Sequence, residues 1–193
     1  KGIVVDKLLE SLIVSKVNFN DILIGDKDAL LIASRILGYG KDYEFNYAGE
    51  KINVDLTKLT NKELDEKLVK DRKNEFTYKL PNTDNTITFK LMTQQDEKNI
   101  QRELEGLKKV SPSNSAELST RMKYMIISIN ENNERPVVRE FVDKAFLAKD
   151  ARALREEIRR VSPDVELKYY GDDVEEAITI PVDLTFFWPD ARV

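Results

Sequence analysis

Residues 43–56, with the sequence YEFNYAGEKINVDL, decide the strand half of the fold. Large and polar side chains alternate over 43–47 and again over 52–56, which is the period-two pattern of a half-buried strand. Between these runs, Ala48-Gly49-Glu50 interrupts the alternation and supplies a glycine for a tight turn. We therefore predict a β-hairpin, and assign it as a hairpin lobe over residues 42–56.

A second stretch later in the chain has the same outline. Residues 165–184 read VELKYYGDDVEEAITIPVDL, with tyrosine and glycine near the middle. The stretch ends on Val182-Asp183-Leu184, as the first ends on Val54-Asp55-Leu56. We predict a second hairpin lobe over 165–184 and interpret the pair as a weak internal repeat. Because the match is short, chance similarity remains an open alternative.

Most of the remaining chain has the apolar spacing of helices. We predict helices over 3–14, 26–38, 94–109 and 115–129, a helix with Pro136 in its first turn, and a helix capped by Asp150. Apolar residues cover nearly every face of 26–38, so we expect that helix to be buried on most sides. A third hairpin is predicted from the alternation in 76–80 and 87–91.

Together these elements predict an α+β fold, with a helical body of four to six helices and two or three β-hairpins. The length of 193 residues suits one domain, which we assign to residues 1–193. Residues 57–74 are strongly charged and contain neither glycine nor proline. We predict that this stretch is a mobile charged connector.

Composition excludes several kinds of chemistry. The chain has no cysteine and no histidine, so disulfides, thiol nucleophiles, imidazole catalysis and Cys/His zinc sites are impossible. With 31 basic and 35 acidic residues the formal charge is −4, and no basic stripe favours nucleic acid. No apolar run is long enough for a membrane span. We expect no catalytic residues, no metal, no cofactor and no zinc.

Two charged groups have ordinary interpretations. Asp172-Asp173 and Glu175-Glu176 crowd the middle of the second lobe, where a solvated turn is the simpler explanation than a paired-acid site. Lys108-Lys109 and Arg159-Arg160 lie at predicted helix ends, where cations favour the helix dipole without any phosphate.

The aromatic run Phe186-Phe187-Trp188 near the end of the sequence has two interpretations. It can pack onto the chain's own core, or it can anchor a partner protein, since large aromatics dominate interface energetics. A strand or helix cannot easily turn three consecutive side chains to one face, so at least one should point outward. We predict partner contacts at these three residues and at the lobe tyrosines Tyr47, Tyr169 and Tyr170.

Three strings resemble one known family. Residues 22–40 (ILIGDKDALLIASRILGYG), 120–126 (TRMKYMI) and 180–191 (IPVDLTFFWPDA) are similar to segments of baseplate-hub and hub-assembly proteins of T-even-type contractile-tailed bacteriophages. The first and last are the most specific, and the resemblance spans most of residues 20–191. Many members of that family carry Cys-x-x-Cys knuckles at the two hairpin tips. Here the tips resemble zinc-ribbon knuckles without cysteine.

The resemblance implies a non-enzymatic role in a virion tail. The chain would be a structural or assembly component of the baseplate hub, put together in the host bacterial cytoplasm. Its partners would be other hub or tail subunits and the tape-measure protein, and it would be present in multiple copies. An alternative is a transient assembly factor that is absent from the mature virion. A weaker alternative is an unrelated binding module of a bacterial host.

Overall fold

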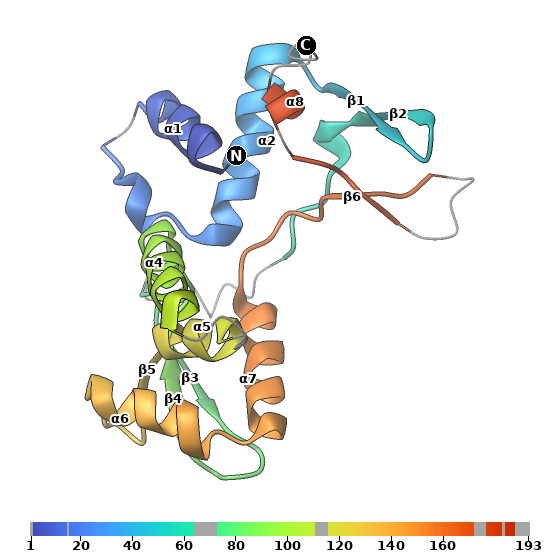
Figure 1. Cartoon of the computed structure of the whole chain (residues 1–193). Helices are drawn as coiled ribbons and strands as arrows, with labels where there is room; N and C mark the ends of the chain where they lie inside the picture. Colours follow the sequence, from blue (N-terminus) through green and yellow to red (C-terminus); the bar gives the residue numbers. More distant parts are fainter. Residues whose placement is uncertain are drawn as a thin grey trace. The chain divides into compact units, whose positions relative to one another are not determined.

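The computed structural model describes residues 2–14, 16–63, 73–110, 116–171, 177–182 and 184–187 (Figure 1). They form two compact units. Unit 1 takes in the described residues of Lys1–Phe19, Gly25–Glu63 and Pro163–Val193, and unit 2 those of Asn20–Ile24 and Leu64–Ser162. Helices and small antiparallel hairpins make the fold α+β, as predicted. The assignment of residues 1–193 to a single domain stays a prediction, which the cooperativity of unfolding would test.

Unit 2 is built on a three-stranded antiparallel sheet. Its strands are β3 (Phe76–Lys79), β4 (Thr86–Phe89) and β5 (Ile126–Ile129), in the order β3-β4-β5. The first two form the predicted third hairpin, with Phe76 opposite Phe89. In the central strand, Ile87 and Phe89 are fully buried and Thr86 and Thr88 are not. This alternation is that of a sheet covered on one face.

Four helices and a π-helical turn complete the described part of unit 2. They are α4 (Gln94–Val110), α5 (Glu117–Met125), α6 (Arg135–Glu140), the π-helical turn η3 (Phe141–Ala145) and α7 (Ala148–Val161). The sheet shares one apolar core with α5, α6 and α7, and α4 contacts α5. The buried members of this core are Leu80, Ile87, Phe89, Leu91, Met122, Met125, Ile126, Ile129, Val138, Leu154, Ile158 and Val161. The predicted caps hold at two places: Thr93 and Asp96 form a reciprocal capping box, and Pro136 lies in the first turn of α6.

Two predictions for unit 2 are wrong. The predicted helix 115–129 ends at Met125, and Ile126–Ile129 becomes β5 because these residues pair with β4. The apolar stripe alone could not reveal this switch, since β-branched isoleucines suit either environment. Asp150 does not cap α7, whose N-cap residue is Leu147. Its buried carboxylate instead accepts hydrogen bonds from Asn82 and Thr83.

Unit 1 combines two helices with the two hairpin lobes. The helices are α1 (Gly2–Leu12) and α2 (Ile24–Tyr39), joined by a segment with the short turn η1 (Phe19–Asp21). Only Leu31, Ile32 and Arg35 of α2 are buried, and Leu37 is 88% exposed. The expected burial of this helix on most sides is therefore wrong. The buried side chains of α2 all lie between Leu31 and Arg35, on one face of the helix.

The first lobe forms as predicted. Strands β1 (Asp42–Tyr47) and β2 (Glu50–Asp55) pair in register, with Tyr47 opposite Glu50. The two loop residues have positive φ, 52° at Ala48 and 89° at Gly49, as a type I′ turn requires. After β2 the chain enters the short helix η2 (Leu56–Lys58), which Asp55 caps by accepting from the Thr57 N–H.

The second lobe is smaller than predicted. Its strands, β6 (Lys168–Tyr169) and β7 (Ile178–Thr179), have two residues each. The end of the predicted lobe is not a strand, because Leu184 begins the short helix α8 (Leu184–Phe187). Both lobes are therefore followed by a short helix, η2 after the first and α8 after the second. This is the similarity between the two lobes that the structure shows. The acidic residues 172–176 lie outside the described residues.

Candidate interaction surface

Two segments of unit 1 that are far apart in sequence pair with each other at the start of the second lobe. Thr60–Lys62, from the stretch predicted as a mobile connector, runs antiparallel to 164–166, with Asn61 opposite Val165. The Lys62 N–H donates to the Asp164 carbonyl at 3.0 Å, and the Glu166 N–H donates to the Thr60 carbonyl at 3.0 Å. This part of the stretch is therefore held by hydrogen bonds. Residues 64–72 of it lie outside the described residues.

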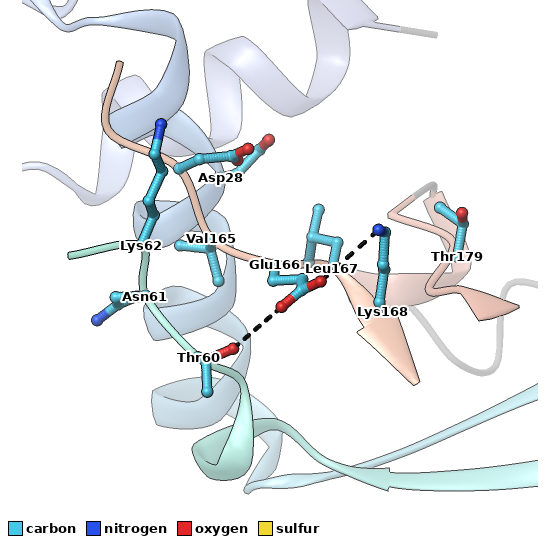
Figure 2. A pocket seen from close by; sticks show the side chains of 10 residues that line it. Asp28, Thr60, Asn61, Lys62, Val165, Glu166, Leu167, Lys168 and Thr179 are labelled. Atoms are coloured by element: carbon cyan, nitrogen blue, oxygen red, sulfur yellow. Dashed lines mark hydrogen bonds and ion pairs between the residues drawn. The ribbon is translucent and has the colours of Figure 1, made fainter. Parts of the chain in front are cut away.

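A cleft of about 510 Å³ opens beside this pairing (Figure 2). Its lining is polar and carries both charge signs, from Asp28, Thr60, Asn61, Lys62, Asp164, Val165, Glu166, Leu167, Lys168 and Thr179. Figure 2 shows the Glu166 carboxylate between Thr60 and Lys168, at 3.4 Å from the hydroxyl and 3.6 Å from the ammonium. The cleft therefore offers both hydrogen-bond donors and hydrogen-bond acceptors.

The pKa values of Glu166 and Asp28, two carboxylates of this cleft, are shifted in opposite directions. Hydrogen bonding from Tyr170 is the main cause that lowers the pKa of Glu166, with help from Lys168 and Thr60. Burial raises the pKa of Asp28, the charge of Lys27 opposes that shift, and Asp164 adds to it. Glu166 is therefore a fixed acceptor rather than a proton donor. Among the described residues, no group of three or more acidic side chains could hold a metal ion.

A second groove, of about 500 Å³, lies between the two lobes of unit 1. One wall comes from β2 and η2, and the other from Lys168, Tyr169 and Tyr170 of the second lobe. Tyr170 is 66% exposed and its hydroxyl donates to Glu166, while Tyr169 is half-buried. Tyr47, also predicted as a contact residue, is 51% exposed at the end of β1. These tyrosines give the lobes aromatic surface that is open to a partner.

The structure places two other predicted contact residues in the core. Phe186 is fully buried and Phe187 is 3% exposed, and their rings contact each other at 5.1 Å. Phe186 also meets Tyr43 edge-to-face at 4.8 Å. Trp188 lies outside the described residues. The interpretation that the aromatic run packs onto the chain's own core is the one that fits its two described members.

Tyr43 is the residue that joins these parts, and the sequence interpretation gave it no role. Its ring contacts Phe186, and its hydroxyl donates to the Pro181 carbonyl at 3.0 Å. The buried guanidinium of Arg35 lies 5.8 Å from the same ring and donates to the carbonyls of Gly40 and Asp42. The inward position of Tyr43 in the alternation of β1 was the available signal, but its partners are far away in sequence.

Within the part of the chain that the structure describes, no helix is long and apolar enough to cross a membrane. The absence of zinc stays a prediction from composition. Comparisons with family models, with curated proteins and with solved structures find no match for this chain.

Proposed function

We propose that this chain is a non-enzymatic, protein-binding component of the baseplate hub of a contractile phage tail. One observation carries the proposal. The two strings that most resemble the hub family, residues 22–40 and 180–191, supply the partners of the same side chain, Tyr43. Arg35 comes from the first string, and Pro181 and Phe186 come from the second. Because both strings contact the same buried side chain, we take their resemblance to the hub family as support for a fold shared with that family rather than as a chance likeness of two short strings.

The surface chemistry supports binding rather than catalysis. The clefts of unit 1 are lined by mixed charges, amides and tyrosines. The exposed tyrosines Tyr47 and Tyr170 are of the kind that interfaces favour, since a tyrosine combines apolar area with a polar end. Other hub subunits or the tape-measure protein are the proposed partners.

Mass spectrometry of purified phage particles and of infected cells tests the proposal. Finding the chain in particles, with hub subunits, supports a permanent subunit. Finding it only in cells, bound to hub intermediates, supports the alternative of a transient assembly factor. Recovering it from neither particles nor hub intermediates would overturn both forms of the proposal.

A paired variant tests the role of the lobe tyrosines. Tyr47→Ala combined with Tyr170→Ala should leave the fold intact and abolish co-purification with hub subunits. The matched control is Leu37→Ala, which removes an exposed large side chain from helix α2 rather than from either lobe. If the tyrosine variant co-purifies as well as the control does, the contact surface lies elsewhere.

A further inference from the structure

The groove of about 500 Å³ between the two lobes has a strand edge on each side. Consecutive residues of β2, 53–55, line one wall, and consecutive residues of the second lobe, 168–170, line the other. Side chains of a strand alternate between its two faces, so a groove lined by consecutive residues runs along the backbone edge rather than over one face.

The edge of β2 in this groove presents unpaired backbone groups. The Leu56 N–H donates to the Lys41 carbonyl at 2.9 Å, which makes residues 41 and 56 a hydrogen-bonded pair of the β1–β2 ladder. Such pairs alternate with pairs whose backbone groups point outward. By the register, Asn53 and Asp55 stand at outward positions, so their N–H groups point away from β1. Within the described chain, the backbone of Asn53 has no hydrogen-bond partner.

The strand of the second lobe uses its two edges for different partners. The Ile180 N–H donates to the Leu167 carbonyl at 3.0 Å, so residue 167 faces β7. Residues 164 and 166 face the other way and bond to residues 60–62, which Figure 2 shows beside Val165. Alternate residues of a strand bond to the same side, so this outer edge continues at residues 168 and 170.

The outer edge is open beyond the pairing with residues 60–62. The chain before Thr60 turns away through η2, and in the described part of the chain β6 pairs with no strand other than β7. The Lys168 N–H turns back to the Glu166 carbonyl at 2.8 Å, while the Lys168 carbonyl and the Tyr170 N–H are directed outward. An edge of this kind accepts an added strand, because its backbone groups are already aligned for pairing.

The charged side chains of the groove indicate what its occupant carries. The two carboxylates of the β1–β2 wall both interact with Lys41, and the Lys168 ammonium lies 3.6 Å from Glu166. Lys58 of η2 also lines the groove and is exposed. It has no ion-pair partner within the part of the chain that the structure describes. An acidic side chain of the occupant beside Lys58 therefore complements the groove.

We propose that an extended segment of a partner protein inserts between β2 and the second lobe, with an acidic side chain beside Lys58. One side of the segment bonds to the outward groups of β2, and the other continues the ladder of residues 60–62 along Lys168 and Tyr170. The inference rests on the proposed function only in naming how a protein partner is held. Its test contains no phage component, so failure of the test leaves the hub proposal standing.

Nuclear magnetic resonance of the full isotope-labelled chain tests the insertion. The probe is a short synthetic peptide rich in threonine and valine, with a glutamate at each end because the direction of the segment is open. On binding, the amide hydrogens of Asn53, Asp55 and Tyr170 should gain protection from exchange. The amide of Asn46, which points outward from the opposite edge of β1, should not.

Methylated peptides make the test specific for a strand held on both sides. A strand between two neighbours donates alternate N–H groups to each of them. Methylating the nitrogens of either alternate set should therefore weaken binding by about tenfold, because several hydrogen bonds are lost in each case. If only one set matters, the peptide adds to a single edge, and the proposal is wrong.

Variants of the chain locate the site. Asn53→Pro removes the outward N–H of β2 and should weaken peptide binding, whereas Asn46→Pro makes the same change on the other edge of the hairpin and should not. Lys58→Glu leaves the backbone unchanged and should also weaken binding, and Lys7→Glu in α1 is its charge control. Thermal melting checks that each variant folds. Absence of binding by the unmethylated peptide, or equal effects of Lys58→Glu and Lys7→Glu, would overturn the proposal.

Discussion

Gly25 lies where two backbone segments of unit 1 come into close contact. A side-chain carbon built at this position would be 1.9 Å from the carbonyl oxygen of Pro163. That oxygen belongs to backbone next to the hydrogen-bonded pairing of Lys62 with Asp164, so it cannot easily move. Gly25, within the resembling string 22–40, is thus explained by a close approach of backbone to backbone.

We predict that Gly25→Ala lowers the free energy of unfolding by about 1–3 kcal/mol, the usual cost of overpacking. Gly38→Ala is the matched control in the same helix, because an added carbon there meets nothing within 4 Å. That control should be neutral or stabilising by about 0.5–1 kcal/mol, since alanine favours helix over glycine. Urea denaturation of both variants checks this, and equal effects would contradict it.

The apolar residues of α2 differ in what they contribute. Ile32 is 7% exposed and Leu37 is 88% exposed, although both are apolar residues of one helix. We predict that Ile32→Ala costs about 2–5 kcal/mol of stability, as core truncations do. Leu37→Ala should change stability by no more than about 0.5 kcal/mol, because the Leu37 side chain is exposed. Urea midpoints of the two variants check the difference, and comparable losses would show that Leu37 is covered.

At the scale of elements, helix α7 holds the loop of the β3–β4 hairpin through one carboxylate. Asp150 accepts from the N–H and the side-chain amide of Asn82 and from the hydroxyl of Thr83, at 2.8–2.9 Å. Burial acts to raise the pKa of Asp150, but the hydrogen bonds from Asn82 and Thr83 together outweigh it and leave the pKa below its usual value. The ionised carboxylate therefore belongs to the folded state.

This lowered pKa makes stability depend on acid. A group whose pKa is lowered on folding stabilises the protein above its unfolded-state pKa, and that contribution is lost as pH falls through the folded-state pKa. We predict that Asp150→Asn destabilises unit 2 near neutral pH and flattens the loss of stability below about pH 4. Asp84→Asn removes an exposed carboxylate from the same loop and serves as control. Parallel pH curves for wild type and Asp150→Asn would refute the role.

On the scale of the whole molecule, unit 1 depends on residues close to the end of the sequence. Phe186 and Phe187 fill its core against Tyr43, so deletion of residues 185–193 removes about 1.5–3 kcal/mol of burial for each phenylalanine. Because both rings are buried, we predict that unit 1 loses its structure while unit 2 keeps its own apolar core.

Hydrogen exchange resolved by peptide measures this prediction. After deletion, amides of α2 and of β1–β2 should lose protection, and those of the β3–β4–β5 sheet should keep it. The Phe187→Leu variant is the milder control, which keeps an apolar side chain at the position. Full protection of unit 1 in the deleted chain would show that the tail is dispensable for folding.

The sequence by itself determined what is local or compositional. Period-two alternation predicted the β1–β2 and β3–β4 hairpins, and Ala48-Gly49 predicted the turn between β1 and β2. Thr93 and Pro136 predicted the starts of two helices. Each of these signals acts within a few residues of the chain. Composition alone excluded disulfides, thiol nucleophiles and imidazole catalysis, because the sequence contains no cysteine and no histidine.

Only the tertiary structure decided which apolar side chains are covered and what the polar ones contact. It turned Ile126–Ile129 into a strand, exposed Leu37, and buried Phe186 and Phe187. It also made Asp150 a partner of Asn82 rather than a cap. Each of these outcomes depends on residues distant in sequence, and burial is a property of the surface that meets a side chain rather than of the side chain alone. Hydrophobic periodicity can therefore predict a helix or a strand, but only the packing of the folded chain determines which face of that element is buried.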